Sequence, residues 1–122
     1  MLNKLFLVFI GGGIGSILRY GTNSILNFYV IGPLGTLFVN VLGSLMFGIL
    51  VSIGEDRSDY FNLFLLTGLL GGFTTFSQFS YDVVTLQNNE TLHSIIYILS
   101  SVLLSISMAL LGIYIANKYI NN

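Results

Sequence analysis

Four apolar stretches, each about as long as a membrane is thick, dominate this sequence. They lie at about residues 5–26, 34–54, 60–81 and 94–116. A helix needs about 20 mostly apolar residues to cross the hydrocarbon core of a bilayer. Only 7% of the residues are charged, against about a quarter in a typical soluble domain. The sequence therefore predicts an all-α integral membrane protein with four transmembrane helices, in which residues 1–122 form a single domain.

The composition excludes several classes of function. The chain has no cysteine and a single histidine, His93, so disulfides, thiolate metal sites and cages of several histidines are excluded. The net charge is −1 and there is no basic cluster, so we expect no nucleic acid partner. The sequence offers no nucleophile paired with a base, and an enzyme is not expected. Lipid, another subunit or a small ligand remain as partners.

The connections between the stretches are short. Lys4 and the apolar run after it resemble a secretory signal, but glycines interrupt the segment 11–15 and no small-residue cleavage site follows. We therefore expect the first stretch to stay as a spanning helix. The only proline, Pro33, suits the first turn of the second helix. A short turn at 27–32 and polar segments at 55–59 and 82–93 are the predicted connections.

The third stretch is unusually polar for its depth. Glycine, hydroxyl and amide side chains crowd its centre: Thr67, Gly68, Gly71, Gly72, Thr74, Thr75, Ser77, Gln78 and Ser80. Non-helical backbone at membrane depth is tolerated only where it is buried in protein or lines a cavity. We therefore predict a third helix that is broken at its centre. The spacing of Gly11 with Gly15, and of Gly68 with Gly72, favours close helix packing over a ligand role.

Two groups of polar residues lie within the other spans, and each has two interpretations. Asn40, one turn after Thr36 on the same face, either makes an interhelical hydrogen bond or lines a pathway, because an unpaired amide in lipid costs a few kcal/mol. Tyr97, Ser101 and Ser105 recur every four residues and share one helix face. They form either a lane of donors for an anion or a packing surface.

Three further residues also have two interpretations. Phe76 and Phe79 share a face just past the expected break. Their rings either fill the core or offer electropositive edges to an anion. Arg19, inside the first span, either reaches toward the interface or holds a positive charge at a pore mouth.

Three segments together carry a resemblance to a known family. They are GGGIGSILRY at 11–20, GTLFVNVLGS at 35–44 and GGFTTFSQFS at 71–80. In this order they closely resemble the fluoride-specific channel family called Fluc or CrcB. The sequence departs from the family pattern at three positions: Gln78 replaces threonine, Asp82 replaces glutamate and Ser16 replaces alanine.

The resemblance implies a fluoride-selective channel that lets cytoplasmic fluoride leave the cell passively and so lowers its toxicity. Family members are dimers of oppositely oriented subunits with two pathways. The resemblance also implies a multi-pass protein of the bacterial plasma membrane. The implied pathway residues are Asn40, Phe76, Phe79, Tyr97, Ser101 and Ser105, joined by Thr36 and Arg19. Backbone carbonyls of Gly71 and Thr74 would hold a structural sodium ion at the dimer centre.

One alternative function and one open question of assembly remain. A small multidrug exporter also has four spans and an antiparallel dimer, but such exporters carry a carboxylate in the first helix, where this chain has Arg19. With four spans both termini share one side, and that side holds Lys4, Arg57 and Lys118. This bias favours cytoplasmic termini. The chain is thus expected to pair either with itself or with an oppositely oriented homologue.

Overall fold

The computed structural model describes residues 1–29, 32–54 and 57–120, and these residues are helical almost throughout. In chain order the helices are α1 (Leu2–Tyr29), α2 (Pro33–Gly54), α3 (Asp59–Asn62), the π-helical η1 (Leu63–Leu70), α4 (Gly71–Phe73), α5 (Phe76–Asn89) and α6 (Thr91–Tyr119). Four segments of the described chain are long and apolar enough to cross a membrane: Leu2–Leu26, Pro33–Gly54, Asp59–Asn88 and Thr91–Tyr119.

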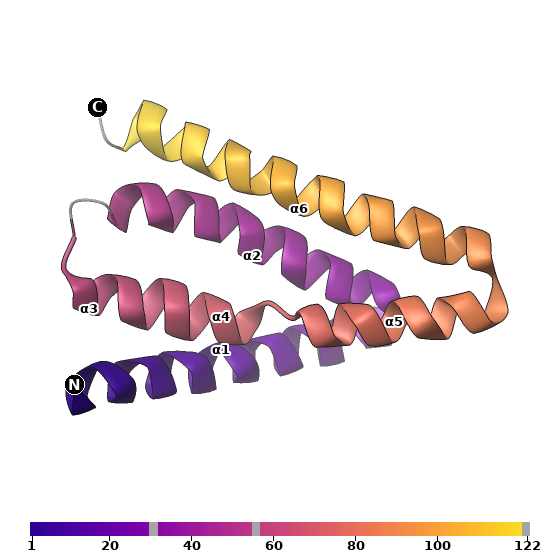
Figure 1. The fold of residues 1–122 in the computed structure, drawn as a ribbon, viewed down its shortest axis with the longest axis horizontal. Coiled ribbons are helices and arrows are strands. Elements are labelled where there is room, and N and C mark those ends of the chain that lie inside the picture. The colour runs from indigo at the N-terminus through magenta and orange to yellow at the C-terminus, as the bar shows by residue number, and fades with distance from the viewer. Residues whose placement is uncertain (30–31, 55–56, 121–122) are drawn as a thin grey trace.

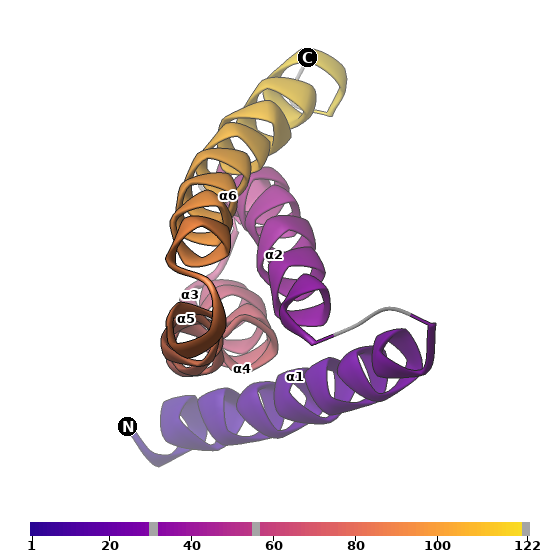
Figure 2. The same ribbon diagram turned by 90° about the vertical axis from the view of Figure 1, so that its right-hand side faces the viewer.

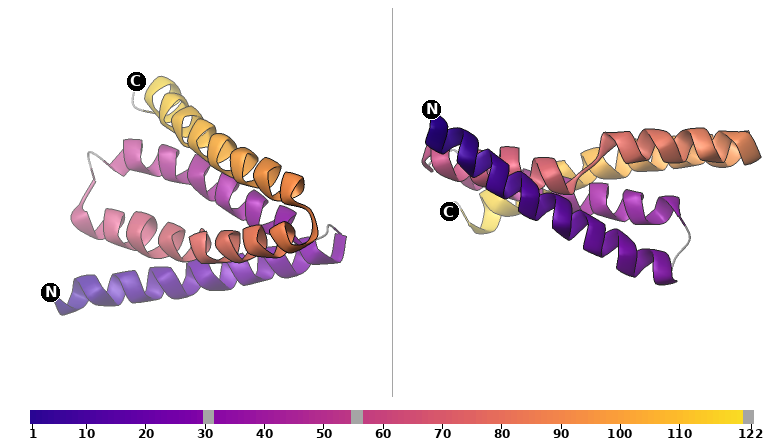
Figure 3. Two further views of the ribbon diagram at one scale, coloured as in Figure 1. Left: turned by 45° about the vertical axis from the view of Figure 1, so that its right-hand side comes forward. Right: turned by 90° about the horizontal axis from the view of Figure 1, so that it is seen from below.

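The four long segments run up and down, so both ends of the chain lie at the same end of the molecule (Figure 1). α2 packs mainly on α6, and α1 packs mainly on η1 and α4. Seen from the end, α1 crosses beneath α4 and α5 and diverges from α2 (Figure 2). The view from below shows the same crossing of α1 over the third segment (Figure 3).

Glycines set the close helix contacts. A Cβ on Gly68 would lie 3.0 Å from the Cα of Gly11, and a Cβ on Gly72 would lie 3.0 Å from the Cα of Gly12. A Cβ on Gly15 would overlap the Leu69 carbonyl oxygen. The packing role predicted from the glycine spacing is therefore confirmed, because these backbones approach as closely as only glycine allows.

The third segment changes its backbone near its middle. α4 ends at Phe73 and α5 begins at Phe76, while Thr74 and Thr75 between them are extended. Thr75 caps α5, since its side-chain oxygen accepts a hydrogen bond from the backbone N–H of Gln78 at 3.2 Å. Two helical pieces with separate ends thus meet at these two threonines.

The predicted connections differ in part from the structure. Segment 82–93 is not a loop: α5 continues to Asn89 and α6 begins at Thr91. The helix continues because Asp82 is buried and the Ser94 hydroxyl ties α6 to the Val83 carbonyl at 3.2 Å. At the other two connections, residues 30–31 and 55–56 lie outside the described residues.

Candidate functional site

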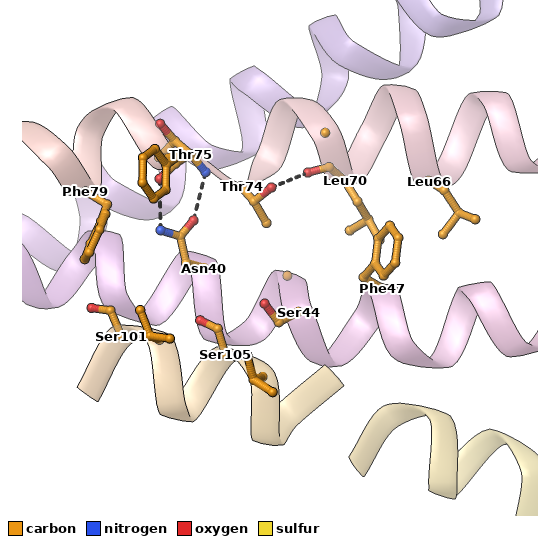
Figure 4. Close-up of a pocket in the computed structure, with 15 residues that line it drawn as sticks. Asn40, Ser44, Phe47, Leu66, Leu70, Thr74, Thr75, Phe79, Ser101 and Ser105 are labelled. Carbon is orange, nitrogen blue, oxygen red and sulfur yellow. Dashed lines mark hydrogen bonds between the residues drawn. The ribbon is translucent and has the colours of Figure 1, made fainter. Parts of the chain in front are cut away.

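A groove of about 390 Å³ lies between α2, α6 and the junction of α4 with α5 (Figure 4). Three parts of the chain contribute polar groups to it: Asn40 and Ser44, Thr74 and Thr75, and Ser101 and Ser105. Apolar side chains such as Phe47, Leu66, Leu70, Phe76 and Phe79 fill the rest of the wall. Within the described lining there is no charged side chain.

Asn40 is fixed by the backbone that it faces. Its Nδ2 donates to the Thr75 carbonyl at 2.9 Å, and its Oδ1 accepts from the Thr75 N–H at 2.8 Å (Figure 4). Thr75 is extended and cannot pair these groups within a helix, so a partner is required. A primary amide has a second N–H donor. Asn40 thus makes an interhelical bond and also lines the groove.

Some of the backbone carbonyls at the junction of α4 with α5 accept hydrogen bonds and others do not. The Leu70 carbonyl accepts from the N–H of Thr74 at 3.0 Å and from its hydroxyl at 2.9 Å. The Gly72 carbonyl accepts from Nε of Arg19 at 3.1 Å. The hydrogen bonds of the described residues include no donor to the carbonyls of Gly71 or Thr74. Both residues line the groove.

Three aromatic rings run from the groove into the protein. The Phe79 ring lies 5.4 Å from that of Phe76 and 5.5 Å from that of Tyr97, between ring centroids. Phe76 is 78% exposed, whereas Phe79 is 9% exposed and Tyr97 is 6% exposed. Phe76 therefore presents its ring to the surroundings, and Phe79 is held by a ring on each side.

Hydroxyl groups continue past these rings. Tyr97, Ser101 and Thr36 are all buried, and Ser101 lies one turn after Tyr97 on α6. Ser101 Oγ is buried and has no hydrogen-bond partner of normal geometry among the described residues. Because a buried hydroxyl without a partner is costly, Ser101 is suited to donate to a small ligand in the groove.

A second cavity of about 480 Å³ lies between α1, α2 and α5. Thr36, Gln78 and Asp82 contribute to its wall. Asp82 is only 8% exposed. It accepts hydrogen bonds from Gln78 Nε2 at 2.9 Å and from the Tyr97 hydroxyl at 3.2 Å. Sequence reasoning did not place Gln78 and Asp82 in the site, although their spacing of four residues on one helix was a usable signal.

The structure brings most of the candidate residues together. The groove lining contains Asn40, Phe76, Phe79, Ser101, Ser105, Gly71 and Thr74. Tyr97 lies behind Phe79, and Thr36 lines the second cavity. Arg19 is not part of the lining and contacts the outer side of the junction at Gly72.

Comparisons with known proteins extend over nearly the whole chain. Residues 6–113 match the family model described as CrcB-like protein, Camphor Resistance (CrcB). A protein of Hyphomonas neptunium named fluoride-specific ion channel FluC is 43% identical, over 96% of this chain and 98% of that protein. Proteins of the same name from Gloeothece citriformis and Flavobacterium psychrophilum are 40% and 38% identical, over 94% and 96% of this chain and 98% and 99% of theirs.

Proposed function

This chain belongs to the CrcB-like family, and from that membership and the lining of the groove we propose that it is one subunit of a fluoride-selective ion channel. The channel lets cytoplasmic fluoride leave the cell passively and so lowers its toxicity. It acts as a transporter and not as an enzyme. The multi-pass chain lies in the plasma membrane of a bacterium, with its termini in the cytoplasm.

The observation that carries the proposal is a wall of uncharged hydrogen-bond donors. Fluoride is small and strongly hydrated, so a pathway must replace lost water with contacts that are neither too weak for entry nor too strong for exit. The buried Ser101 hydroxyl, the second N–H of Asn40 and the ring edges of Phe76 and Phe79 are such contacts. A Lys or Arg in this wall would hold the ion too firmly.

The hydroxyls of α6 give the pathway its length. Ser105 and Ser101 line the groove, and Tyr97 lies one turn before Ser101 on α6. The Tyr97 hydroxyl donates to Asp82, which lines the second cavity together with Thr36. Fluoride passes from one cavity to the other along these hydroxyls. Arg19 contributes positive potential from outside the wall, where it also offsets the carbonyl charge at the end of α4.

The third membrane helix is broken at its centre, and its two halves are the pieces on either side of Thr74 and Thr75. Two oppositely oriented subunits pack with their grooves together. A structural sodium ion fits at their contact, because the carbonyls of Gly71 and Thr74 have no described donor and line the open groove. The ion would supply the positive partner that these oxygens lack.

The test of the channel is fluoride efflux from liposomes. Purified protein is reconstituted into vesicles loaded with potassium fluoride, and efflux is recorded with a fluoride electrode after valinomycin opens a path for potassium. We expect efflux of fluoride and far slower efflux of chloride. No fluoride efflux from protein that is folded and dimeric would exclude this function. Proton-driven export of organic cations would instead favour the multidrug exporter.

The subunit contact and the sodium ion are tested on a background that has no cysteine. We expect Gly71→Cys to form a disulfide across the dimer on oxidation. Phe9→Cys, on the exposed face of α1, should not form one. Replacing sodium by a large organic cation should lower the midpoint temperature of dimer dissociation. An unchanged midpoint would reject the ion without rejecting the dimer.

A further inference from the structure

Asp82 is a buried carboxylate in the wall of the second cavity, and the proposed function gives it no role. Burying a charge costs several kcal/mol unless it is paired or hydrogen-bonded. Both of its oxygens have donors: Oδ1 accepts from Gln78 and Oδ2 accepts from Tyr97. Gln78 lies on the same helix as Asp82, one turn earlier, whereas Tyr97 lies on α6. The carboxylate therefore joins an amide on α5 to a phenol on α6.

The Tyr97 phenol, which donates to Asp82, also supports the wall of the groove through Phe79. The Tyr97 ring packs on Phe79, and Tyr97 lies one turn before Ser101 on α6; Phe79 and Ser101 both line the groove. The orientation of the Asp82 carboxylate decides where the Tyr97 hydroxyl points. With Oδ1 held by Gln78, Oδ2 is directed at α6.

We propose that Gln78 is a positioning residue for fluoride passage, which acts through Asp82 to fix the Tyr97 phenol and the Phe79 ring against it. This inference rests on the proposed channel function. The amide is needed for its N–H, because a side chain without a donor leaves Oδ1 of the buried carboxylate unpaired. The Gln78 side chain is not part of the groove lining; it lies in the wall of the second cavity and donates to Asp82.

The pair can be reversed without changing its net charge. In the double variant Q78E/D82N, the amide at position 82 donates to the carboxylate at position 78, and its carbonyl oxygen still accepts from Tyr97. In Q78E alone two carboxylates face each other and neither has a proton to donate. In D82N alone the Gln78 amide can turn over and accept from the amide N–H at position 82, so both hydrogen bonds are kept. Q78E thus breaks the arrangement that the double change restores.

The experiment compares initial rates of fluoride efflux per folded dimer. Q78M and Q78E should each lower the rate about tenfold, the order expected for losing one hydrogen bond to a charged group. Q78E/D82N should return to within about twofold of the natural protein, as a coupled pair requires. Gln87→Met, an exposed position on the same helix, is the control and should leave the rate unchanged.

A double-mutant cycle with Tyr97→Phe separates positioning from a structural role. If Gln78 acts through the phenol, Q78M should cause no further fall once the hydroxyl is absent. An equal fall in both backgrounds, or a Q78M rate equal to that of the natural protein, would overturn the proposal. If Q78M does not fold, the comparison of Q78E with the reversed pair decides. If the natural protein shows no fluoride efflux, both the channel function and this inference are wrong. If the natural protein conducts but substitutions at position 78 leave the efflux rate unchanged, only this inference is wrong.

Discussion

Asn40 pairs with the extended backbone between α4 and α5. Thr75 gives up its helical partners, and the Asn40 amide replaces one donor and one acceptor with bonds of 2.9 and 2.8 Å. Each such bond contributes about 1 kcal/mol, and losing one inside lipid leaves a costly unpaired group. The residue that lines the groove is thus also the residue that keeps the junction extended.

We predict that Asn40→Asp blocks fluoride passage. An ionised carboxylate repels both the anion and the Thr75 carbonyl, and a protonated one loses an amide donor. Liposome efflux should fall to the level of empty vesicles while the dimer persists in gel filtration. Asn88→Asp, which adds the same group at an exposed position near the end of α5, should conduct normally. Unchanged efflux in Asn40→Asp would leave Asn40 with only its interhelical role.

We also predict that Phe76→Ile and Phe79→Ile, made singly, abolish or sharply lower efflux. Most apolar volume is kept, but the electropositive ring edge is lost. Phe76 is exposed and should be replaceable without loss of stability, whereas Phe79 loses ring contacts worth about 0.5–1.5 kcal/mol each. Phe9→Ile, an exposed ring on α1, is the control. Full efflux in both variants would show that these rings only fill space.

Residue spacing predicted part of this site, and its limits are physical. Helical periodicity places Ser101 with Ser105 and Phe76 with Phe79, because each pair is separated by one turn. Periodicity cannot show that Asn40 meets the Thr75 backbone, since that contact joins residues 35 positions apart in different helices. Contacts of this kind follow from the packing of helices and not from the sequence of either one.

At the scale of elements, the crossing of α1 over η1 and α4 depends on glycines, which have no side chain to keep the helices apart. Backbone meets backbone at Gly11, Gly15, Gly68 and Gly72. In lipid no hydrophobic force drives helices together, so close van der Waals packing must do so. Because α1 supports the piece that ends at Phe73, this contact also fixes where the Gly71 and Thr74 carbonyls lie.

We predict opposite effects for alanine at two neighbouring glycines. A Cβ on Gly15 would overlap the Leu69 carbonyl and lie 2.8 Å from the Phe73 nitrogen, whereas a Cβ on Gly13 meets nothing within 4 Å. Gly15→Ala should destabilise the protein by about 1–3 kcal/mol through overpacking. Gly13→Ala should be neutral or stabilising by up to about 1 kcal/mol through helix propensity. Thermal unfolding in detergent compares them, and equal effects would contradict the packing role of Gly15.

Element boundaries show where sequence reasoning is weakest. Polar residues such as Gln87 and Asn88 indicated a connection, yet they lie on the exposed side of a helix that continues to Asn89. Polarity alone cannot separate a loop from the end of a helix that leaves the membrane. The apolar stretches were predicted more securely, because the thickness of the bilayer sets their length.

At the scale of the whole molecule, the basic residues other than Arg19 lie toward one end (Figure 1). Both termini and the start of α3 lie there (Figure 1). Lys4 forms a salt bridge of 3.0 Å with Asp59, and Lys118 lies over the rings of Tyr114 and Tyr119. Insertion follows the distribution of Lys and Arg more than net charge, so pairing with Asp59 does not cancel the contribution of Lys4.

The end that carries the termini holds Lys4, Arg57 and Lys118, whereas residues 27–33 and 82–93, around the two opposite connections, include no Lys or Arg. A subunit that inserts both ways to form an antiparallel homodimer should be nearly balanced. We therefore predict that this chain inserts mainly with its termini in the cytoplasm and pairs with an oppositely biased homologue. A homodimer is the alternative assembly, and so small a bias is compatible with it.

Reporter fusions at the C-terminus decide between these assemblies. Two fusions are made after residue 122, one to an enzyme that is active only in the cytoplasm and one to an enzyme that is active only outside it. We expect almost all of the signal to come from the cytoplasmic reporter. Fluoride resistance of a sensitive host should then require a second, oppositely oriented homologue. Changing Lys4 and Lys118 to Gln removes two of three charges and should bring the two reporter signals toward equality, because less positive charge remains to set the orientation. Comparable signals from the unaltered chain, together with resistance from this chain alone, would instead establish a dual-topology homodimer.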